Sequence, residues 1–405
     1  MSSSDFSGGD MPFFDLRNLF GAAGGDPWAN AGELAAAIAS EGGSETNLDP
    51  LVRMAVEDLV RVAELHIAQA TGITLPSNTK VTPVTRREWT TSSIDTFRPF
   101  FERFGEAVGT AMQVEGSEGA DPLGAMLSQL FASMGPMLVS VSAGSMIGHL
   151  GQTALGQYDL PIPRDSAEVL VVPASIDAAA ADWDVPVADL RLWVLLHELA
   201  AHAVLSVPHV KRRMESLLLD FAAAFHPNPE AIAEQFSGMG QLTDLSQLAE
   251  MSEQLNDPDL LLNMMRSPAH DLLVPQFDAL VASIIGFVGY TVAETGRPLI
   301  GSIDVIREQF RQRWLDVTPA DRFMERLLGL EITAETLARG DRFIDGIVTR
   351  AGDEGLARLW ADELDLPTAA EVDAPGLWLA RIGLDADVGQ VSAEVPDDLS
   401  GLDEL

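Results

Sequence analysis

The segment from residue 187 to 206 constrains the fold more than any other part of the sequence, because it predicts a long helix that must be buried. Pro186 suits the start of a helix and Pro208 forces a stop. The residues between them are mostly apolar, with His197 and Glu198 in the middle. Burying two such polar side chains costs free energy unless they have partners or a cavity, so the pair is a candidate functional site.

The spacing of the histidines in this segment matches a zinc site only in part. In the motif H-E-x-x-H, a step of four residues brings two imidazoles to one helix face, where they share a zinc ion while the Glu activates a bound water. Here position 201 is Ala201, and the next histidine is His202. A step of five residues turns about 140° around an ideal helix instead of about 40°. Both imidazoles would reach one ion only through a π-bulge.

Two interpretations of the pair remain open. In the first, His197 and Glu198 are a relic pair that is hydrogen-bonded in the interior and retained for packing. In the second, His202 swings in through a helix bulge and an acid supplies the third bond to zinc. The candidate acids are Glu215, Asp220, Asp278 and Glu294. The other histidines considered show no metal spacing and are interpreted as surface or core residues: His149, His209, His226 and His270.

The charge and the cysteine content exclude several classes of function. The chain has 61 acidic and 25 basic residues, a formal charge of -36, which repels phosphate backbones and predicts no nucleic-acid partner. It has no cysteine, so disulfides, thiolate metal sites and cysteine nucleophiles are excluded and any metal must use His, Asp or Glu. The first basic residue, Arg17, follows three aspartates, unlike a secretory signal. We therefore expect a cytoplasmic protein.

Composition and local patterns predict a mainly α fold. Hydrophobic residues make up 47% of the chain and aromatics only 6%, a balance that suits packed helices. The first clear helix begins after Asp49 and ends at Gly72, and helical patterns resume from about 187 to 375. The strand signal, Val169 to Val172, lies between prolines and predicts a short strand or ribbon before the helix that carries His197.

The sequence predicts one helical body between two disordered tails. Residues 1–48 are rich in Gly and acids and are expected to form a flexible tail, in which the apolar residues of 11–20 would dock on the body or on a partner. Residues 49–380 are expected to form the domain, with a helical part 49–155 and a second part 156–350 that contains His197. Residues 381–405 are expected to be an acidic disordered tail.

The uncharged segment from 122 to 150 raises the question of a membrane span. Glycines and Pro136 interrupt or flank it, and no basic cluster or aromatic belt marks a membrane interface. We expect a buried helical hairpin here and no membrane span.

Several segments together resemble a known family. They are, in order, Gly156-Gln-Tyr-Asp-Leu-Pro161, Val171-Val-Pro173, Leu190-Arg-Leu-Trp-Val-Leu-Leu-His-Glu198 and His202-Ala-Val-Leu-Ser-Val-Pro-His209. The sequence resembles the type 2 zincin-like metallopeptidases of actinobacteria over residues 50–350. The resemblance implies a zincin-like fold, with His197 as the first zinc ligand and Glu198 as the general base.

Two ligand positions of that family are altered in this sequence. Ala201 falls on the second zinc ligand, and the family's later Glu-Gly pair matches Ile285-Gly286, so that Ile285 replaces the third. A catalytic zinc normally keeps three protein ligands. We therefore expect a degenerate metallopeptidase, a pseudoenzyme that acts by binding a peptide or protein, with zinc as the only cofactor if there is one. The alternative is an active zinc peptidase with ligands rearranged around His197, Glu198 and His202.

Other catalytic classes lack their motifs. The chain has no phosphate loop of the type G-x-x-x-x-G-K-[ST], no dinucleotide glycine fingerprint after a strand and no G-x-S-x-G elbow.

Overall fold

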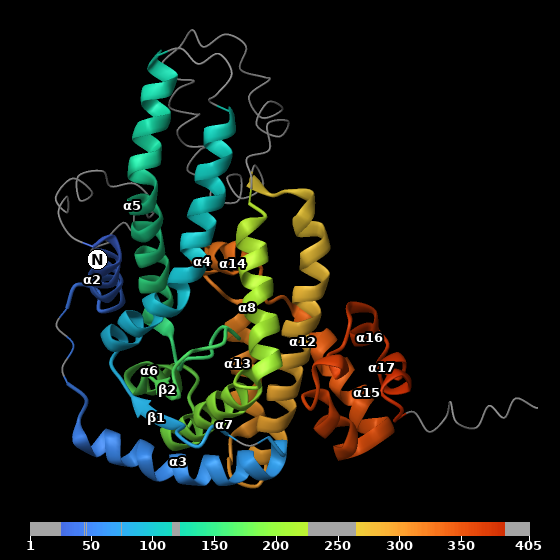
Figure 1. Cartoon of the computed structure of the whole chain (residues 1–405). Coiled ribbons are helices and arrows are strands. Elements are labelled where there is room, and N and C mark those ends of the chain that lie inside the picture. Colours follow the sequence, from blue (N-terminus) through green and yellow to red (C-terminus); the bar gives the residue numbers. More distant parts are fainter. Residues whose placement is uncertain are drawn as a thin grey trace, which may run out of the picture.

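A computed structural model describes residues 26–384, apart from 44, 46, 74, 116–121 and 226–264 (Figure 1). The apolar residues of 11–20, His226 and the acidic segment 385–405 lie outside the described residues. The fold is mainly helical, as predicted. The helices are α2 (Pro27–Ala39), α3 (Pro50–Thr71), α4 (Arg86–Glu115), α5 (Pro122–Thr153), α6 (Pro173–Asp182), α7 (Val187–Leu205), α8 (Pro208–Ala223), α12 (Pro268–Gly296), α13 (Ile303–Leu315), α14 (Pro319–Leu328), α15 (Ala334–Leu359), α16 (Ala369–Asp373) and α17 (Pro375–Arg381), with a short 3-10 turn η2 (Glu363–Asp365).

Two helices begin and end at the residues that the sequence analysis predicts. Helix α3 begins after Asp49, whose side chain accepts a hydrogen bond from the backbone N–H of Leu51 at 2.8 Å. It ends at Gly72, which has φ 63 and so adopts the left-handed conformation that glycine tolerates. Helix α7 spans Val187–Leu205, between the two prolines that bound the prediction.

The predicted strand is confirmed, and it has a partner that the sequence did not reveal. Strand β2 (Glu168–Val171) pairs in parallel with β1 (Lys80–Pro83), in the register Lys80 to Glu168 and Pro83 to Val171. Strand β1 has only four residues, too few for a period-two pattern to stand out. The segment after α5 lies against β2, because the N–H of Val172 donates to the carbonyl of Leu155 at 2.9 Å.

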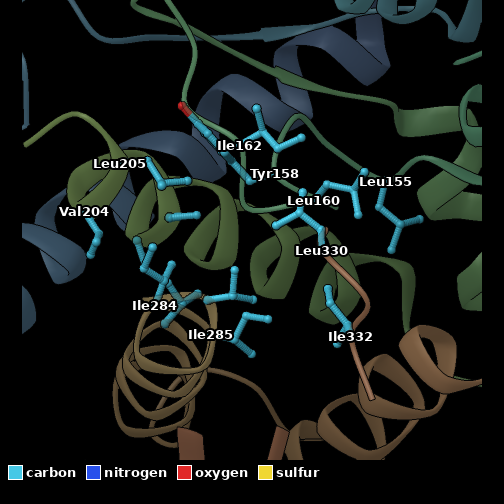
Figure 2. Packing of buried hydrophobic residues seen from close by; sticks show 14 of the residues in the cluster. Leu155, Tyr158, Leu160, Ile162, Val204, Leu205, Ile284, Ile285, Leu330 and Ile332 are labelled. Carbon is cyan, nitrogen blue, oxygen red and sulfur yellow. The ribbon is translucent and has the colours of Figure 1, made fainter. Parts of the chain in front are cut away.

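Helix α7 is the centre of the core. Every residue from Leu192 to Leu205 is buried, and α7 contacts α3, α6, α12 and β2. Figure 2 shows buried residues of this core, among them Val204 and Leu205 of α7 and Ile284 and Ile285 of α12. The continuous apolar pattern of α7 is explained by this burial on all sides.

The expectation of a tail up to residue 48 is wrong for residues 27–39, which form α2 and pack on α5. The contact is close because α5 presents glycines to it. A Cβ at Gly144 would lie 2.6 Å from the carbonyl oxygen of Ala31, and one at Gly148 would lie 3.0 Å from that of Ala35. The glycines of 8–43 suggested a flexible segment, but the matching small residues on the two helices allow a packed pair.

The expected hairpin within 122–150 is also corrected, because these residues belong to the single helix α5. The hairpin partner of α5 is instead α4, which lies beside it (Figure 1). Among the described helices, α12 is long and apolar enough to cross a membrane. Helices α7 and α8 meet the same criterion only if they are counted together as one span, although the chain bends by 87° between them. In α12, 61% of the apolar 18-residue stretch that meets this criterion is buried inside the structure, and the core helix of a soluble protein is buried in the same way.

We predict opposite effects of two Gly→Ala substitutions on the packing of α2 against α5. In Gly148→Ala, the new Cβ would lie 2.8 Å from Cβ of Ile38, and such overpacking should lower the free energy of unfolding by about 1–3 kcal/mol. Gly32→Ala, in α2 with nothing within 4 Å, should raise it by about 0.5–1 kcal/mol through helix propensity. Urea unfolding followed by circular dichroism measures both, and equal effects of the two changes would contradict the packing described.

Candidate functional site

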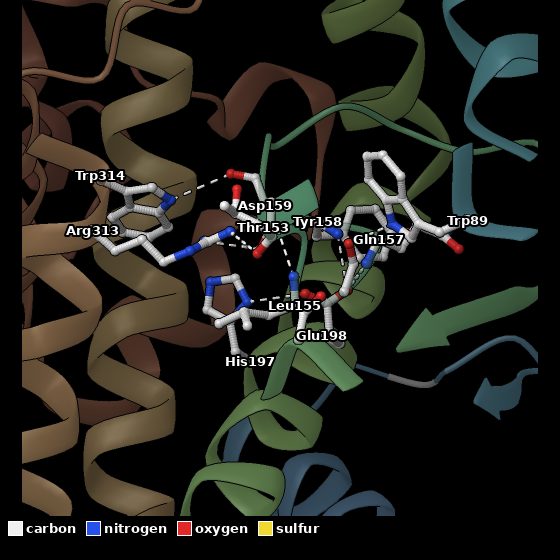
Figure 3. A network of polar contacts seen from close by, with 12 residues as sticks. Trp89, Thr153, Leu155, Gln157, Tyr158, Asp159, His197, Glu198, Arg313 and Trp314 are labelled. Atoms are coloured by element: carbon white, nitrogen blue, oxygen red, sulfur yellow. Dashed lines mark hydrogen bonds and ion pairs between the residues drawn. The ribbon is translucent and has the colours of Figure 1, made fainter. Parts of the chain in front are cut away.

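Glu198 is buried in the middle of α7, with an exposed fraction of 1%. Its Oε2 accepts hydrogen bonds from the backbone N–H groups of Gln157 and Tyr158, each at 2.8 Å (Figure 3). Its Oε1 lies 3.4 Å from Nδ1 of His197. Burial raises the pKa of Glu198, against the opposing effects of the hydrogen bond and charge of His197 and of the Tyr158 N–H. The carboxylate therefore anchors the segment that follows α5.

Gly156 is required at this anchor because the carboxylate group of Glu198 packs directly on its backbone. A Cβ at position 156 would lie 2.3 Å from Cδ of Glu198, closer than any side chain tolerates. The indole N–H of Trp89 donates to the Gly156 carbonyl at 2.7 Å, so the turn is held from both sides. This explains locally why the sequence has a glycine before Gln157.

A second set of bonds fixes the next residues of the same segment to α13. Oδ2 of Asp159 accepts from the backbone N–H of Leu155 at 2.9 Å and from Arg313 at 2.8 Å. Arg313 also donates to the carbonyl of Thr153 at 3.0 Å, and the indole of Trp314 donates to the Asp159 carbonyl at 3.3 Å (Figure 3). The polar network around Glu198 thus connects α7, the segment after α5, and α13.

His197 lies beside this network in an aromatic and apolar environment. Its ring centroid is 4.8 Å from that of Phe310 and 5.9 Å from that of Trp314. It lines a cavity of about 30 Å³ together with Ile285 of α12. The position that the family resemblance aligned with the third zinc ligand thus faces the same cavity as His197, and its side chain offers no donor atom.

His202 is placed differently from His197, and both of its ring nitrogens already have partners. Nδ1 is 2.7 Å from the hydroxyl of Tyr158, and Nε2 is 3.2 Å from Oγ1 of Thr79. Burial lowers the pKa of His202 to about 4, so the ring is neutral at neutral pH. Helix α7 is α-helical over its whole length, without the π-bulge that would turn His202 toward His197.

The described residues do not fit a zinc ion. No group of three or more His, Asp or Glu side chains in the described part of the chain could hold a metal. Ala201 is buried and has no donor atom. The acids considered as third ligands have other partners: Glu215 with Lys211, Asp220 with Ser216, Asp278 with Arg339, and Glu294 with Arg297.

One of the remaining histidines has a structural role that the sequence did not reveal. His270 is fully buried at the first turn of α12, where its Nδ1 accepts a hydrogen bond from the backbone N–H of Ser267 at 3.1 Å and forms a capping box. The rings of Phe221 and Phe225 each lie with centroids 4.5 Å from its own. A Ser three residues before a His is a weak capping signal, because Glu or Gln is usual there.

A larger cavity, of about 380 Å³, borders the segment that Glu198 anchors. It is lined by residues of that segment, among them Gln157, Asp159 and Arg164, and by aromatic residues that include Trp89 and Trp314. His197, Glu198 and His202 do not line it. No local sequence pattern predicts this cavity, because its lining residues come from segments far apart in the chain.

Comparisons with known proteins bear on the whole chain. The model of a family described as zincin-like metallopeptidase matches residues 27–379. No curated protein matches the chain. A solved structure described as a "putative hydrolase with a novel fold" from Chloroflexus aurantiacus is similar, with 21% sequence identity, a TM-score of 0.60, and coverage of 88% of this chain and 98% of that one. At this identity the likeness concerns the fold alone.

We predict that Glu198 contributes to stability as an acceptor of hydrogen bonds. Glu198→Ala leaves the N–H groups of Gln157 and Tyr158 without a partner and should lower the free energy of unfolding by about 2–4 kcal/mol. Glu198→Gln keeps an oxygen acceptor and should change it by no more than about 1 kcal/mol. Glu294→Ala, which removes only a partly exposed surface pair, is the control and should change it by less than about 0.5 kcal/mol. Chemical unfolding measures all three, and a stable Glu198→Ala variant would contradict the anchor.

We also predict a pH effect from His270. Burial lowers its pKa in the folded chain. The unfolded chain, with a histidine pKa of about 6.5, therefore takes up a proton that the folded chain resists, and stability is lost as pH falls below that value. His270→Gln keeps an acceptor at the capping-box position and removes the titration. Its stability should fall less than that of the wild type between neutral and acidic pH in urea unfolding, and identical losses in the two proteins would refute the assignment.

Proposed function

The chain belongs to the zincin-like metallopeptidase family, and from that premise we propose that it keeps the fold without zinc catalysis and acts by binding a peptide or protein. It would then be a pseudoenzyme of its family. The proposal concerns the loss of the reaction and not the loss of the fold, because the family match extends over nearly all of the described chain.

The observation that carries the proposal is the position of the Glu198 carboxylate. In a zincin site the Glu accepts a proton from a metal-bound water, so one of its oxygens must face that water. Here Oε2 accepts two backbone hydrogen bonds and Oε1 is next to His197, while Gly156 packs against the group. The side chain that would be the general base holds a turn of the chain.

The donor atoms support the same conclusion. In the alignment that the family resemblance implies, His197 is the sole histidine at a ligand position, since Ala201 and Ile285 fall on the other two positions. His202 is bonded to Tyr158 and Thr79. One histidine holds zinc weakly, whereas a catalytic site normally needs three protein ligands.

The polar network around Glu198 favours a binding role for the chain. It fixes the segment that borders the cavity of about 380 Å³, where a ligand or a partner's side chain can enter. The charge of -36 argues against nucleic acid as the partner. The absence of cysteine supports a place for this protein in the cytoplasm.

The second candidate is an active zinc peptidase with rearranged ligands. It is favoured by the intact contact between His197 and Glu198, and by the cavity that His197 shares with Ile285. For this function α7 would have to bulge so that His202 releases Tyr158 and turns toward His197.

Zinc stoichiometry separates the two candidates. The purified chain is stripped with a chelator, given a small excess of zinc and desalted, and its metal content is measured. We expect far less than one zinc per chain in the wild type, and no further loss in His197→Ala, because the donors do not converge.

His149→Ala is the control for zinc that binds at unspecific sites, and its zinc content per chain should equal that of the wild type. One zinc per chain that is lost in His197→Ala, together with peptidase activity that is lost in Glu198→Gln, would reject the proposal in favour of the active enzyme.

A further inference from the structure

Arg164 lines the larger cavity, and none of the described carboxylates forms an ion pair with it, although the charges of Glu198 and Asp159 act on it. Its Nη2 donates to the carbonyl oxygen of Gln157 at 2.8 Å, and its guanidinium lies 5.4 Å from the ring centroid of Phe97. Its Nε is buried and has no acceptor. Burial lowers the pKa of Arg164 to about 10, and the group stays charged at neutral pH. A partly buried cation with a buried, unused donor is unfavourable unless something else supplies an acceptor.

Two more donors line the same cavity. Gln157 is 4% exposed, and its Nε2 has no acceptor, although its Oε1 accepts from the backbone N–H of Leu170 at 3.1 Å. Arg86 donates through Nε to the hydroxyl of Ser175 at 3.0 Å and has no ion pair within the described part of the chain. Arg86, Gln157 and Arg164 all line the cavity of about 380 Å³. The cavity is therefore bordered by two arginines without an ion pair in the described part of the chain, and also by acids, among them Asp321, whose buried Oδ1 has no donor among the described residues.

This lack of carboxylate partners is unusual in so acidic a chain. Other partly buried arginines are paired with acids: Arg191 with Asp177, Arg313 with Asp159, Arg322 with Glu325, and Arg339 with Asp278 and Asp373. With 61 acids against 25 bases, carboxylates are abundant. Arg86 and Arg164 thus lack a carboxylate partner within the described part of the chain, and they border a cavity where an external acceptor has room to enter.

The rest of the lining indicates what kind of acceptor fits. Trp89, Phe97 and Trp183 offer apolar surface beside the arginines. The cavity is also lined by five acids, Asp159, Asp182, Asp316, Asp321 and Glu325, so a dianion such as phosphate would be repelled more strongly than a singly charged group. A carboxylate matches the planar fork of a guanidinium and carries one negative charge.

We propose that this cavity binds a small organic acid, with its carboxylate on Arg164 and Arg86 and its apolar part against Trp89, Phe97 and Trp183. Glu198 acts indirectly, because its hydrogen bonds to the N–H groups of Gln157 and Tyr158 fix the segment that carries Gln157 and Arg164. The inference deepens the binding part of the proposed function, because it names a ligand class for the same cavity; it does not depend on the loss of zinc catalysis, since neither His197 nor His202 lines the cavity.

The test compares two probes of nearly equal shape, cyclohexanecarboxylate and cyclohexanecarboxamide, by isothermal titration calorimetry on the full chain. We expect the carboxylate to bind at millimolar concentration or below, and the amide to bind about tenfold more weakly or not at all, because charge-assisted hydrogen bonds to arginine are lost. Inorganic phosphate should bind more weakly than the carboxylate.

Variants assign the binding to the arginines. Arg164→Gln and Arg86→Gln should each weaken binding of the carboxylate about tenfold. Arg87→Gln is the matched control, because Arg87 adjoins Arg86 but pairs with Glu33 and does not line the cavity, and it should bind like the wild type. If Arg164→Gln does not fold, the affinity of Arg86→Gln for the carboxylate tests the proposal. This second variant removes fewer internal contacts, because Nε of Arg86 donates only to Ser175 among the described residues.

Three results would overturn the proposal: no binding of the carboxylate at millimolar concentration, equal affinity for the acid and the amide, or unchanged affinity in Arg86→Gln. Stronger binding of phosphate than of the carboxylate would overturn the ligand class. None of these results would alter the zinc measurement, so the two proposals fail independently.

Discussion

A carboxylate in the centre of a helix that is buried on all sides sets the arrangement around it. Glu198 has an exposed fraction of 1%, and such a group is tolerated only when hydrogen bonds replace its water. The N–H groups of Gln157 and Tyr158 supply these bonds, and Gly156 provides the room. The segment after α5 must therefore approach α7 closely, which no side chain at position 156 would permit.

The consequences extend from this contact to both cavities. The anchored segment continues into Asp159, whose bonds to Arg313 and to the N–H of Leu155 hold α13 in place. Helix α13 brings Phe310 and Trp314 against His197, and this apolar contact occupies the ring face on that side. On its other side the same segment presents Arg164 to the larger cavity. His197 and Glu198, a pair typical of zinc catalysis, thus lie in a network of contacts that holds the surrounding elements in place.

Several elements could be predicted because their signals are local. Proline and Asp at helix starts, Gly72 at a helix end and the apolar run of α7 act within a few residues, and each was found where the sequence indicated. Helix α2 and strand β1 were missed for the opposite reason. Glycines around α2 suggest disorder until Ala31 and Ala35 meet the glycines of α5, and the four residues of β1 form a strand only beside β2.

The sequence by itself determined the helical class, the place and burial of α7, and the absence of a ligand side chain at Ala201, because composition, periodicity and residue identity do not depend on distant contacts. The direction in which His197, Glu198 and His202 point was decided only by the tertiary structure. Each side chain is fixed by a partner far away in the chain: Phe310 for His197, Gln157 for Glu198, and Thr79 for His202. The cavity around Arg164 was decided in the same way, since no local pattern reveals which arginines are left without a carboxylate when the chain folds.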